Sequence, residues 1–163
     1  MKKWRPSERR EWATRFAPVK LFITKHSLHR NLPVDLTPVN ELYEVKLLPF
    51  SGATLGFACG SVIAVNEALH YFQRRMVIAH ELAHLLLEHP DSFFLCNLND
   101  WWYNKFEVEA QKAAALILVP WKPLAALVQR GCGIRDLEEH FEVPGQLLEL
   151  RLKMGHHQTG HPG

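Results

Sequence analysis

Two histidines and one glutamate interrupt an otherwise apolar stretch of this chain, and this stretch limits the possible folds more than any other segment. Residues 76–87 are apolar except for His80, Glu81 and His84, which form the pattern H-E-x-x-H. On a helix, His80 and His84 lie about 40° apart around the axis and about 6 Å apart along it, with Glu81 about 60° beyond His84. The opposite face is apolar, so we predict a buried helix that turns three polar groups toward one space.

The H-E-x-x-H pattern is typical of a helix that binds zinc. The two imidazoles reach one ion from adjacent turns, and the glutamate acts as a general base without being a ligand. The alternative is a pair of hydrogen-bonded core histidines, which suits a lone histidine better than three polar residues on one arc of an apolar helix. We therefore predict His80 and His84 as metal ligands and Glu81 as the catalytic residue.

A zinc site of this kind needs a third protein ligand and an open position. The metzincin pattern would place a glycine and a histidine where this chain has Leu87 and Pro90, so that class is excluded. The candidates are Glu107 and Glu109, which lie about 200° apart on a helix, so that only one of them can face the metal.

The neighbours of the two glutamates favour Glu107 as the ligand. Its arc of the helix is the apolar stripe Ala110, Ala114, Ile117 and Leu118. A carboxylate on such a stripe is costly unless something compensates its charge, and a metal ion would do so. Glu109 shares its arc with Lys105 and Lys112, and we expect it on the solvent side as their ion-pair partner.

Four further residues are candidates for supporting roles at the site. Gln111 follows Glu107 by one turn and is predicted to orient the ligands. Tyr71, Tyr103 and His89 are the nearby candidates for an oxyanion donor or for a hydrogen-bond partner of the ligands, and the sequence does not choose among them.

The remaining pattern predicts an α+β, zincin-like fold. Strand-like runs at 45–50, 54–58 and 61–65 are separated by tight turns, which favours a small antiparallel three-stranded meander packed against the H-E-x-x-H helix. The H-E-x-x-H helix is expected to span about 69–89. Further helices are expected at 7–16, 35–43 and 104–119, with a loop at 91–103. Residues 1–153 are expected to form a single domain: a basic N-terminal helix (1–30), a catalytic core (31–120) and a C-terminal helical segment (121–153), followed by a disordered tail (154–163).

Composition and charge narrow the class of protein. The three cysteines form no C-x-x-C pair, so neither a disulfide framework nor a cysteine zinc site is expected. No signal peptide or membrane-spanning stretch is evident, and a cytoplasmic location is expected. Nine basic and two acidic side chains give the first thirty residues a net charge of +7, whereas residues 31–163 carry −5. The basic segment is interpreted as a solvated helix or, alternatively, as a surface that approaches nucleic acid or an acidic partner.

Two spaced motifs resemble the ImmA/IrrE family of zinc metallopeptidases. The first leads from residues 61–66 into Ile78–Leu87, and the second runs from Glu107 to Pro120. The family's second motif is similar to E-x-x-A-N-x-F-A-A-x-L-L-x-P, and its leading glutamate, a metal ligand, corresponds to Glu107. The chain departs from the usual pattern at Gln111, where asparagine is usual, and at Ala83 and Ala113.

The resemblance implies a site-specific metallo-endopeptidase that cleaves a helix-turn-helix transcriptional repressor and so derepresses mobile-element or stress-response genes. The implied cofactor is Zn²⁺, with Mn²⁺ as the alternative in the cell. We expect a monomer whose partner is its protein substrate, with no direct binding to nucleic acid or membranes.

Two other functions remain open at this point. Residues 134–152 have the rhythm of a helix-turn-helix, which would suit a DNA-binding module, although Asp136, Glu138 and Glu139 oppose contact with phosphates. The other alternative is a regulatory member of a toxin–antitoxin pair with a non-catalytic metal site, which the intact Glu81 argues against.

Overall fold

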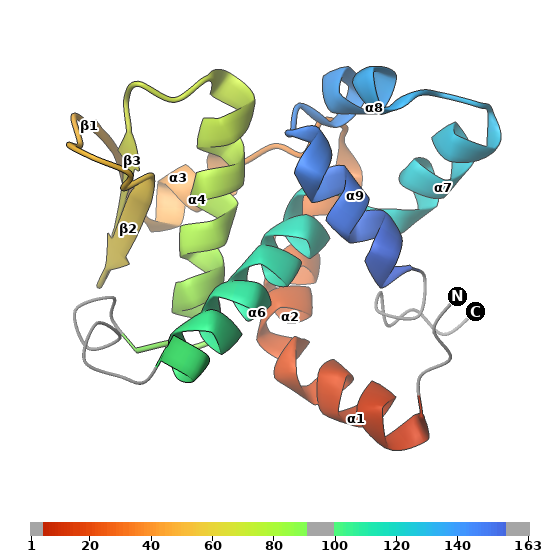
Figure 1. The fold of residues 1–163 in the computed structure, drawn as a ribbon, viewed down its shortest axis with the longest axis horizontal. Coiled ribbons are helices and arrows are strands. Elements are labelled where there is room, and N and C mark those ends of the chain that lie inside the picture. Colours follow the sequence, from red (N-terminus) through yellow and green to blue (C-terminus); the bar gives the residue numbers. More distant parts are fainter. Residues whose placement is uncertain (1–4, 91–99, 156–163) are drawn as a thin grey trace.

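The structure is a computed structural model that describes residues 5–90 and 100–155, with only the backbone described for residues 100–103. The elements follow the order shown in Figure 1: α1 (Pro6–Arg15), α2 (Ala17–Lys25), the short 3-10 helix η1 (Leu28–Arg30), α3 (Thr37–Leu42), β1 (Glu44–Leu48), β2 (Gly56–Cys59), β3 (Val62–Asn66), α4 (Tyr71–Leu86), α6 (Asp100–Leu118), α7 (Trp121–Gln129), α8 (Ile134–Phe141) and α9 (Gly145–Met154). This α+β architecture, with a small sheet against the H-E-x-x-H helix, confirms the predicted zincin-like fold class.

The sheet is mixed, and the predicted antiparallel meander is wrong. Its strand order is β1-β3-β2, in which β2 is antiparallel to β3 and β1 is parallel to β3. The hairpin between β2 and β3 forms as expected, with Gly60 at φ +57° in the tight turn. β3 takes the central position because it is the most apolar strand: Ile63, Ala64 and Val65 are fully buried, whereas most of β1 is exposed.

Helix α4 lies between the sheet and helix α6 (Figure 1). His70 is the N-cap of this helix, and its Nδ1 accepts a hydrogen bond from the backbone N–H of Phe72. Ala79, Leu82 and Ala83 on its apolar face are fully buried. The predicted helix at 69–89 is therefore confirmed, although it begins two residues later and ends three residues earlier than predicted.

Helix α6 is the central element of the helical part of the molecule. Its second half, Ala113–Leu118, is buried, and α2, α4 and α9 all pack against it. The helix begins at Asp100, earlier than the predicted start at residue 104, so part of the predicted loop at 91–103 is helical. The rest of that loop, residues 91–99, lies outside the described residues.

The basic N-terminal segment was predicted as one helix, but the structure shows two helices and a 3-10 helix. The chain bends at Phe16, the N-cap of α2, and Pro18 lies in the first turn of α2, where a proline is tolerated because no intrahelical N–H is needed. Trp12 and Phe16 are buried and stack on each other, so the segment joins the core cluster that extends to Met154.

The C-terminal segment forms three helices, α7, α8 and α9, as the breaks in the sequence indicate. Leu137, Phe141 and Leu147 are buried where α8 and α9 pack together. Residues 156–163, most of the predicted disordered tail, lie outside the described residues. In the part of the chain that the structure describes, no single helix is long and apolar enough to cross a bilayer. The helix segments 104–118 and 121–129 together have the length and composition of a membrane span, but they are bent by 74° at the break between them.

Candidate metal centre

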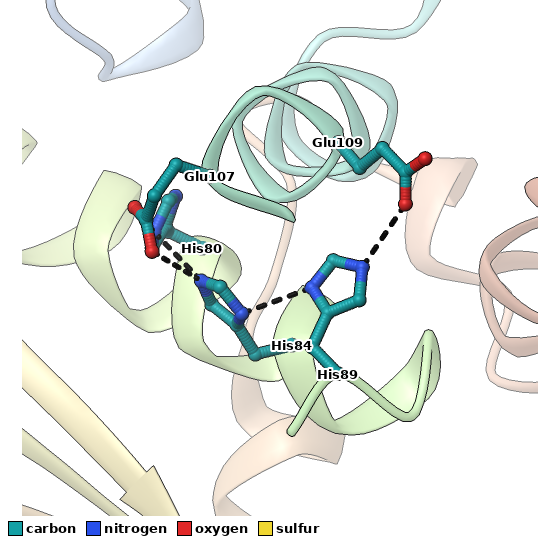
Figure 2. Close-up of polar contacts among 5 residues, drawn as sticks. All are labelled: His80, His84, His89, Glu107 and Glu109. Atoms are coloured by element: carbon teal, nitrogen blue, oxygen red, sulfur yellow. Dashed lines mark hydrogen bonds and ion pairs between the residues drawn. The ribbon is translucent and has the colours of Figure 1, made fainter. Parts of the chain in front are cut away.

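The structure brings together the three residues predicted as metal ligands. His80 and His84 project from adjacent turns of α4, and Glu107 faces them from α6 (Figure 2). The His80 and His84 Nε2 atoms are 3.1 Å apart. Glu107 places Oε2 3.2 Å from His80 Nε2 and Oε1 3.4 Å from His84 Nε2. Two nitrogens and a carboxylate thus converge on one point between two helices.

The spacing of these atoms matches a tetrahedral zinc site. Zinc binds imidazole nitrogen and carboxylate oxygen at about 2.0–2.2 Å, so two ligands of a tetrahedron lie about 3.3–3.5 Å apart. The two nitrogens are 3.1 Å apart, and they lie 3.2 and 3.4 Å from the two different carboxylate oxygens of Glu107, which is close to this value; one ligand atom from each residue lies within 4.8 Å of the others. The donor set of two imidazoles and one carboxylate is one that catalytic zinc sites use, with the fourth position open. The residues present therefore fit a zinc ion.

Glu107 is held in its ionised form by the two histidines. Burial raises its pKa, but hydrogen bonds with His80 and His84 outweigh burial and lower the pKa to about 2. Its side chain remains 28% exposed, so the carboxylate stands at the edge of an opening and not deep in the core.

Glu81 lies on the sheet side of α4 and is not part of the triangle. It is only 8% exposed, and burial raises the pKa of its carboxyl group, opposed by the nearby His80 and His84. The backbone of Ala58 in β2 also hydrogen-bonds to it. A carboxylate with a raised pKa beside a metal site is suited to accept and return a proton.

Gly56 allows β2 to approach Glu81 closely. A Cβ atom at this position would lie 2.6 Å from Val77 Cγ1 and 2.7 Å from the backbone oxygen of Ala64. Only glycine therefore permits the present distance between β2 and α4 without a shift of the backbone.

A pocket of about 820 Å³ opens in front of the triangle. Its walls come from four places in the chain: β2 and the residues before it, α4, α6 and α9. Met76, Ala114, Leu147 and Leu150 give it an apolar side, while Gln111 adds an amide. The pocket thus joins the candidate metal ligands and Glu81 to a space large enough for several residues of a peptide.

Glu109 is not a solvent-side residue, and this prediction is wrong. Its side chain is 14% exposed and binds two partners from other elements. Arg15 of α1 donates from Nε at 2.7 Å and from Nη2 at 2.6 Å to Oε2, and His89 Nε2 lies 3.1 Å from the same oxygen. The helix period correctly turns Glu109 away from Glu107, but α1 and the end of α4 cover the side it faces.

The pKa values in this second group follow from its contacts. Burial raises the pKa of Glu109, but the hydrogen bonds with Arg15 and His89 outweigh it and lower the pKa. Burial lowers the pKa of His89 to about 4, with His84 adding to the effect and Glu109 opposing it. His89 is therefore a neutral imidazole at physiological pH.

The four supporting candidates reach different places. His89 lies against His84, with the two Nδ1 atoms 3.0 Å apart, and is not part of the pocket wall. Gln111 lines the pocket. Tyr71 is half exposed at the start of α4, about 14 Å along the axis from His80, and does not line the pocket. The side chain of Tyr103 lies outside the described residues.

Sequence reasoning missed Arg15 and the contribution of α9 to the pocket. The only signal for α9 was the spacing of its apolar residues, which indicated a buried helix but did not indicate which element it packs against. For Arg15 no local signal existed, because its partner is 94 residues away along the chain.

A comparison with known protein families shows to which family the chain belongs. The family model described as the IrrE N-terminal-like domain, a peptidase family, matches residues 41–153. The chain belongs to this family. The resemblance to the ImmA/IrrE peptidases is thereby confirmed, and membership implies a peptidase that uses a metal ion, in agreement with the His-His-Glu group. The match leaves out residues 1–40, and with them Arg15. A search of curated proteins found no match.

Proposed function

We propose that this member of the IrrE N-terminal-like family is a zinc-dependent, site-specific endopeptidase and that its substrate is a helix-turn-helix transcriptional repressor. The observation that carries the proposal is the triangle of His80, His84 and Glu107, at zinc-ligand spacing, beside a buried Glu81 that is not part of it. Three ligands leave a fourth position free for substrate or water, which is the arrangement of a catalytic site and not of a structural one.

The residues of the chain divide the work of peptide hydrolysis among them. His80, His84 and Glu107 would hold the zinc ion, which when bound polarises the scissile carbonyl and lowers the pKa of water. Glu81 takes the proton from the attacking water and passes it to the nitrogen of the leaving amine. Its raised pKa suits this exchange, because the carboxyl group must both accept and release a proton in one cycle.

The edge of β2 is suited to bind the substrate backbone. In the described sheet β2 pairs on one side with β3 only, and Gly56 and Phe57 of β2 line the pocket. An extended peptide can add to this edge as a further strand, which would place its carbonyl groups in front of the three ligands. A folded segment would not fit this binding mode, so the cleaved bond is expected in a linker or an unfolded segment.

The repressor as substrate rests on the family resemblance. The DNA-binding alternative is less well supported, since α9 uses one face to pack against α6 and lines the pocket with Leu147 and Leu150. A recognition helix needs a free face for the major groove, and α8 adds acidic residues that repel phosphates. Helix α9 is better explained as one wall of the pocket, with α8 packed against it.

The test is whether a neighbouring gene encodes a helix-turn-helix repressor and whether this protein cleaves that repressor with zinc and, separately, with manganese. The wild-type protein is expected to cut it at one bond, and Glu81→Gln is expected to bind zinc normally but to cut at least about 100-fold more slowly. Glu139→Gln, which removes an exposed glutamate of α8, is the matched control and should cut like wild type. Equal cleavage by Glu81→Gln and wild type would overturn the mechanism, and repressor left intact with either metal would overturn the proposed substrate.

A further inference from the structure

We propose that His89, Glu109 and Arg15 form a hydrogen-bonded relay that positions His84 as a zinc ligand and selects its metal-binding tautomer. The inference rests on the proposed function, because it assumes a metal ion at His80, His84 and Glu107. It assigns a role to the end of α4, to the outer side of α6 and to the N-terminal helix α1.

The end of helix α4 itself brings His89 to His84. The backbone N–H of His89 donates to the His84 carbonyl at 3.0 Å, and the backbone N–H of Glu88 donates to the Leu85 carbonyl at 3.2 Å. Glu88 stands between them with φ at +53°. These are the two bonds and the left-handed residue of a Schellman motif, in which the chain turns back over the last helical turn. The motif usually joins two apolar side chains, but here it joins two imidazoles.

The hydrogen bonds of the relay run in one consistent direction. His84 Nε2 faces His80 and Glu107, so metal binding through Nε2 requires the proton on Nδ1. His84 Nδ1–H then donates to His89 Nδ1, 3.0 Å away. His89 must in turn carry its proton on Nε2, which donates to Glu109 Oε2 at 3.1 Å (Figure 2). Each atom of the relay has one role, and the opposite tautomer of His84 would put a proton where the metal binds.

Arg15 completes the relay by compensating the charge of Glu109. Both its Nε and its Nη2 reach Oε2, at 2.7 and 2.6 Å. The His89 side chain is fully buried and that of Glu109 is 14% exposed, so an uncompensated carboxylate here would be costly. With its charge matched, Glu109 is a fixed acceptor for His89. Outer hydrogen bonds of this kind hold a ligating histidine in orientation and raise its basicity.

The relay makes the N-terminal helix part of the metal centre. Arg15 is the last residue of α1, and it lies outside the residues matched by the family model. Its fork of two N–H donors is suited to one carboxylate oxygen held between two elements, which a lysine ammonium group would grip less rigidly. We therefore assign His89, Glu109 and Arg15 as positioning residues.

The experiment measures the zinc affinity of the full-length protein by competition with a chromogenic chelator. The double variant His80→Ala/His84→Ala supplies the background, which includes binding by the tail histidines His156, His157 and His161. His89→Ala is expected to bind zinc about 10–100-fold more weakly than wild type. His89→Asn, whose side-chain oxygen can still accept from His84 Nδ1, should recover most of the loss.

Variants of Arg15 test the far end of the relay without altering the buried imidazole. Arg15→Ala is expected to lower zinc affinity several-fold, and Arg10→Ala, which removes an exposed arginine from the same helix, should leave it unchanged. With Co²⁺ in place of zinc, the visible spectrum should change in His89→Ala and Arg15→Ala but not in Arg10→Ala. A purely structural role would lower the melting temperature without moving the spectrum.

The possible results separate the two proposals. If wild type binds zinc no better than His80→Ala/His84→Ala, the proposed metal site is wrong. If wild type binds zinc there, but His89→Ala and Arg15→Ala match it in affinity and in Co²⁺ spectrum, the relay is wrong and the proposed function stands. If His89→Ala does not fold, Arg15→Ala and His89→Asn decide the question by the same two measurements.

Discussion

Helix α6 carries one glutamate on each of two sides, and each glutamate faces histidine. The two sides differ in the other residues and in the open space around them. On one side Glu107 meets His80 and His84, and on the other Glu109 meets His89 (Figure 2). The first group opens into a pocket, and its carboxylate is 28% exposed. The second group is covered by α1, and its carboxylate is 14% exposed.

The difference shows what a histidine–glutamate pair requires in order to become a metal site. At Glu109 a guanidinium group of the protein already balances the charge of the carboxylate. At Glu107 the ion-pair partners among the described residues are two imidazoles with their nitrogens at metal-ligand spacing, and a pocket opens beside them. Charge compensation from within the chain therefore separates a positioning cluster from a candidate metal centre, although both pair a glutamate with histidine.

The largest expected effect contrasts the two glutamates directly. Glu107→Ala removes a ligand and should weaken zinc binding more than about 100-fold, beyond the range typical of outer hydrogen-bond partners. Glu109→Ala should weaken it about 10-fold, through His89 and His84. Chelator competition measures both. Val108→Ala, an exposed position between them, is the control and should bind like wild type. A larger loss in Glu109→Ala than in Glu107→Ala would reverse the assignment of the two sides.

A smaller effect tests whether the open side depends on the close approach of β2. Gly56→Ala places a Cβ against Val77 and the Ala64 backbone, and is expected to lower the free energy of unfolding by about 1–3 kcal/mol. Urea denaturation measures this change. Peptide hydrolysis should also fall, since β2 moves away from Glu81. Gly133→Ala, where the nearest atom would be at 3.5 Å, is the control and should cost much less. Unchanged stability in Gly56→Ala would show that the strand can shift freely.

The smallest effect concerns the turn that carries the closed side. Glu88 is exposed and has φ at +53°, a conformation that costs an L-residue about 1–2 kcal/mol and glycine almost nothing. Glu88→Gly is therefore expected to raise the free energy of unfolding by about 0.5–1 kcal/mol, with zinc affinity unchanged. Glu139→Gly, inside helix α8, should instead lower it by about 1 kcal/mol. A loss of stability in Glu88→Gly would mean that the turn does not carry this strain.

Part of the candidate site could be predicted from local periodicity. The helical repeat places His80, Glu81 and His84 on one arc and turns Glu107 and Glu109 to opposite sides, and the structure has all five in these directions. The apolar stripe around Glu107 also indicated which glutamate faces the histidines. Such predictions succeed because the helical repeat is a local property that tertiary contacts rarely change.

Two of the predictions that failed depended on partners from other elements of the fold. Lys105 and Lys112 were plausible partners for Glu109 by helix spacing, but Arg15 binds it across 94 residues. The meander was the simplest topology for three short strands, but β3 is placed between β1 and β2 because the most apolar strand gains most from the centre.

The sequence by itself determined that this chain presents two imidazoles and a carboxylate from one helix toward a second carboxylate on another. Only the tertiary structure decided that Glu107 stands at an open pocket and that Arg15 neutralises Glu109. The physical reason is that side-chain direction along a helix follows from backbone geometry, whereas charge compensation and burial depend on how distant helices pack.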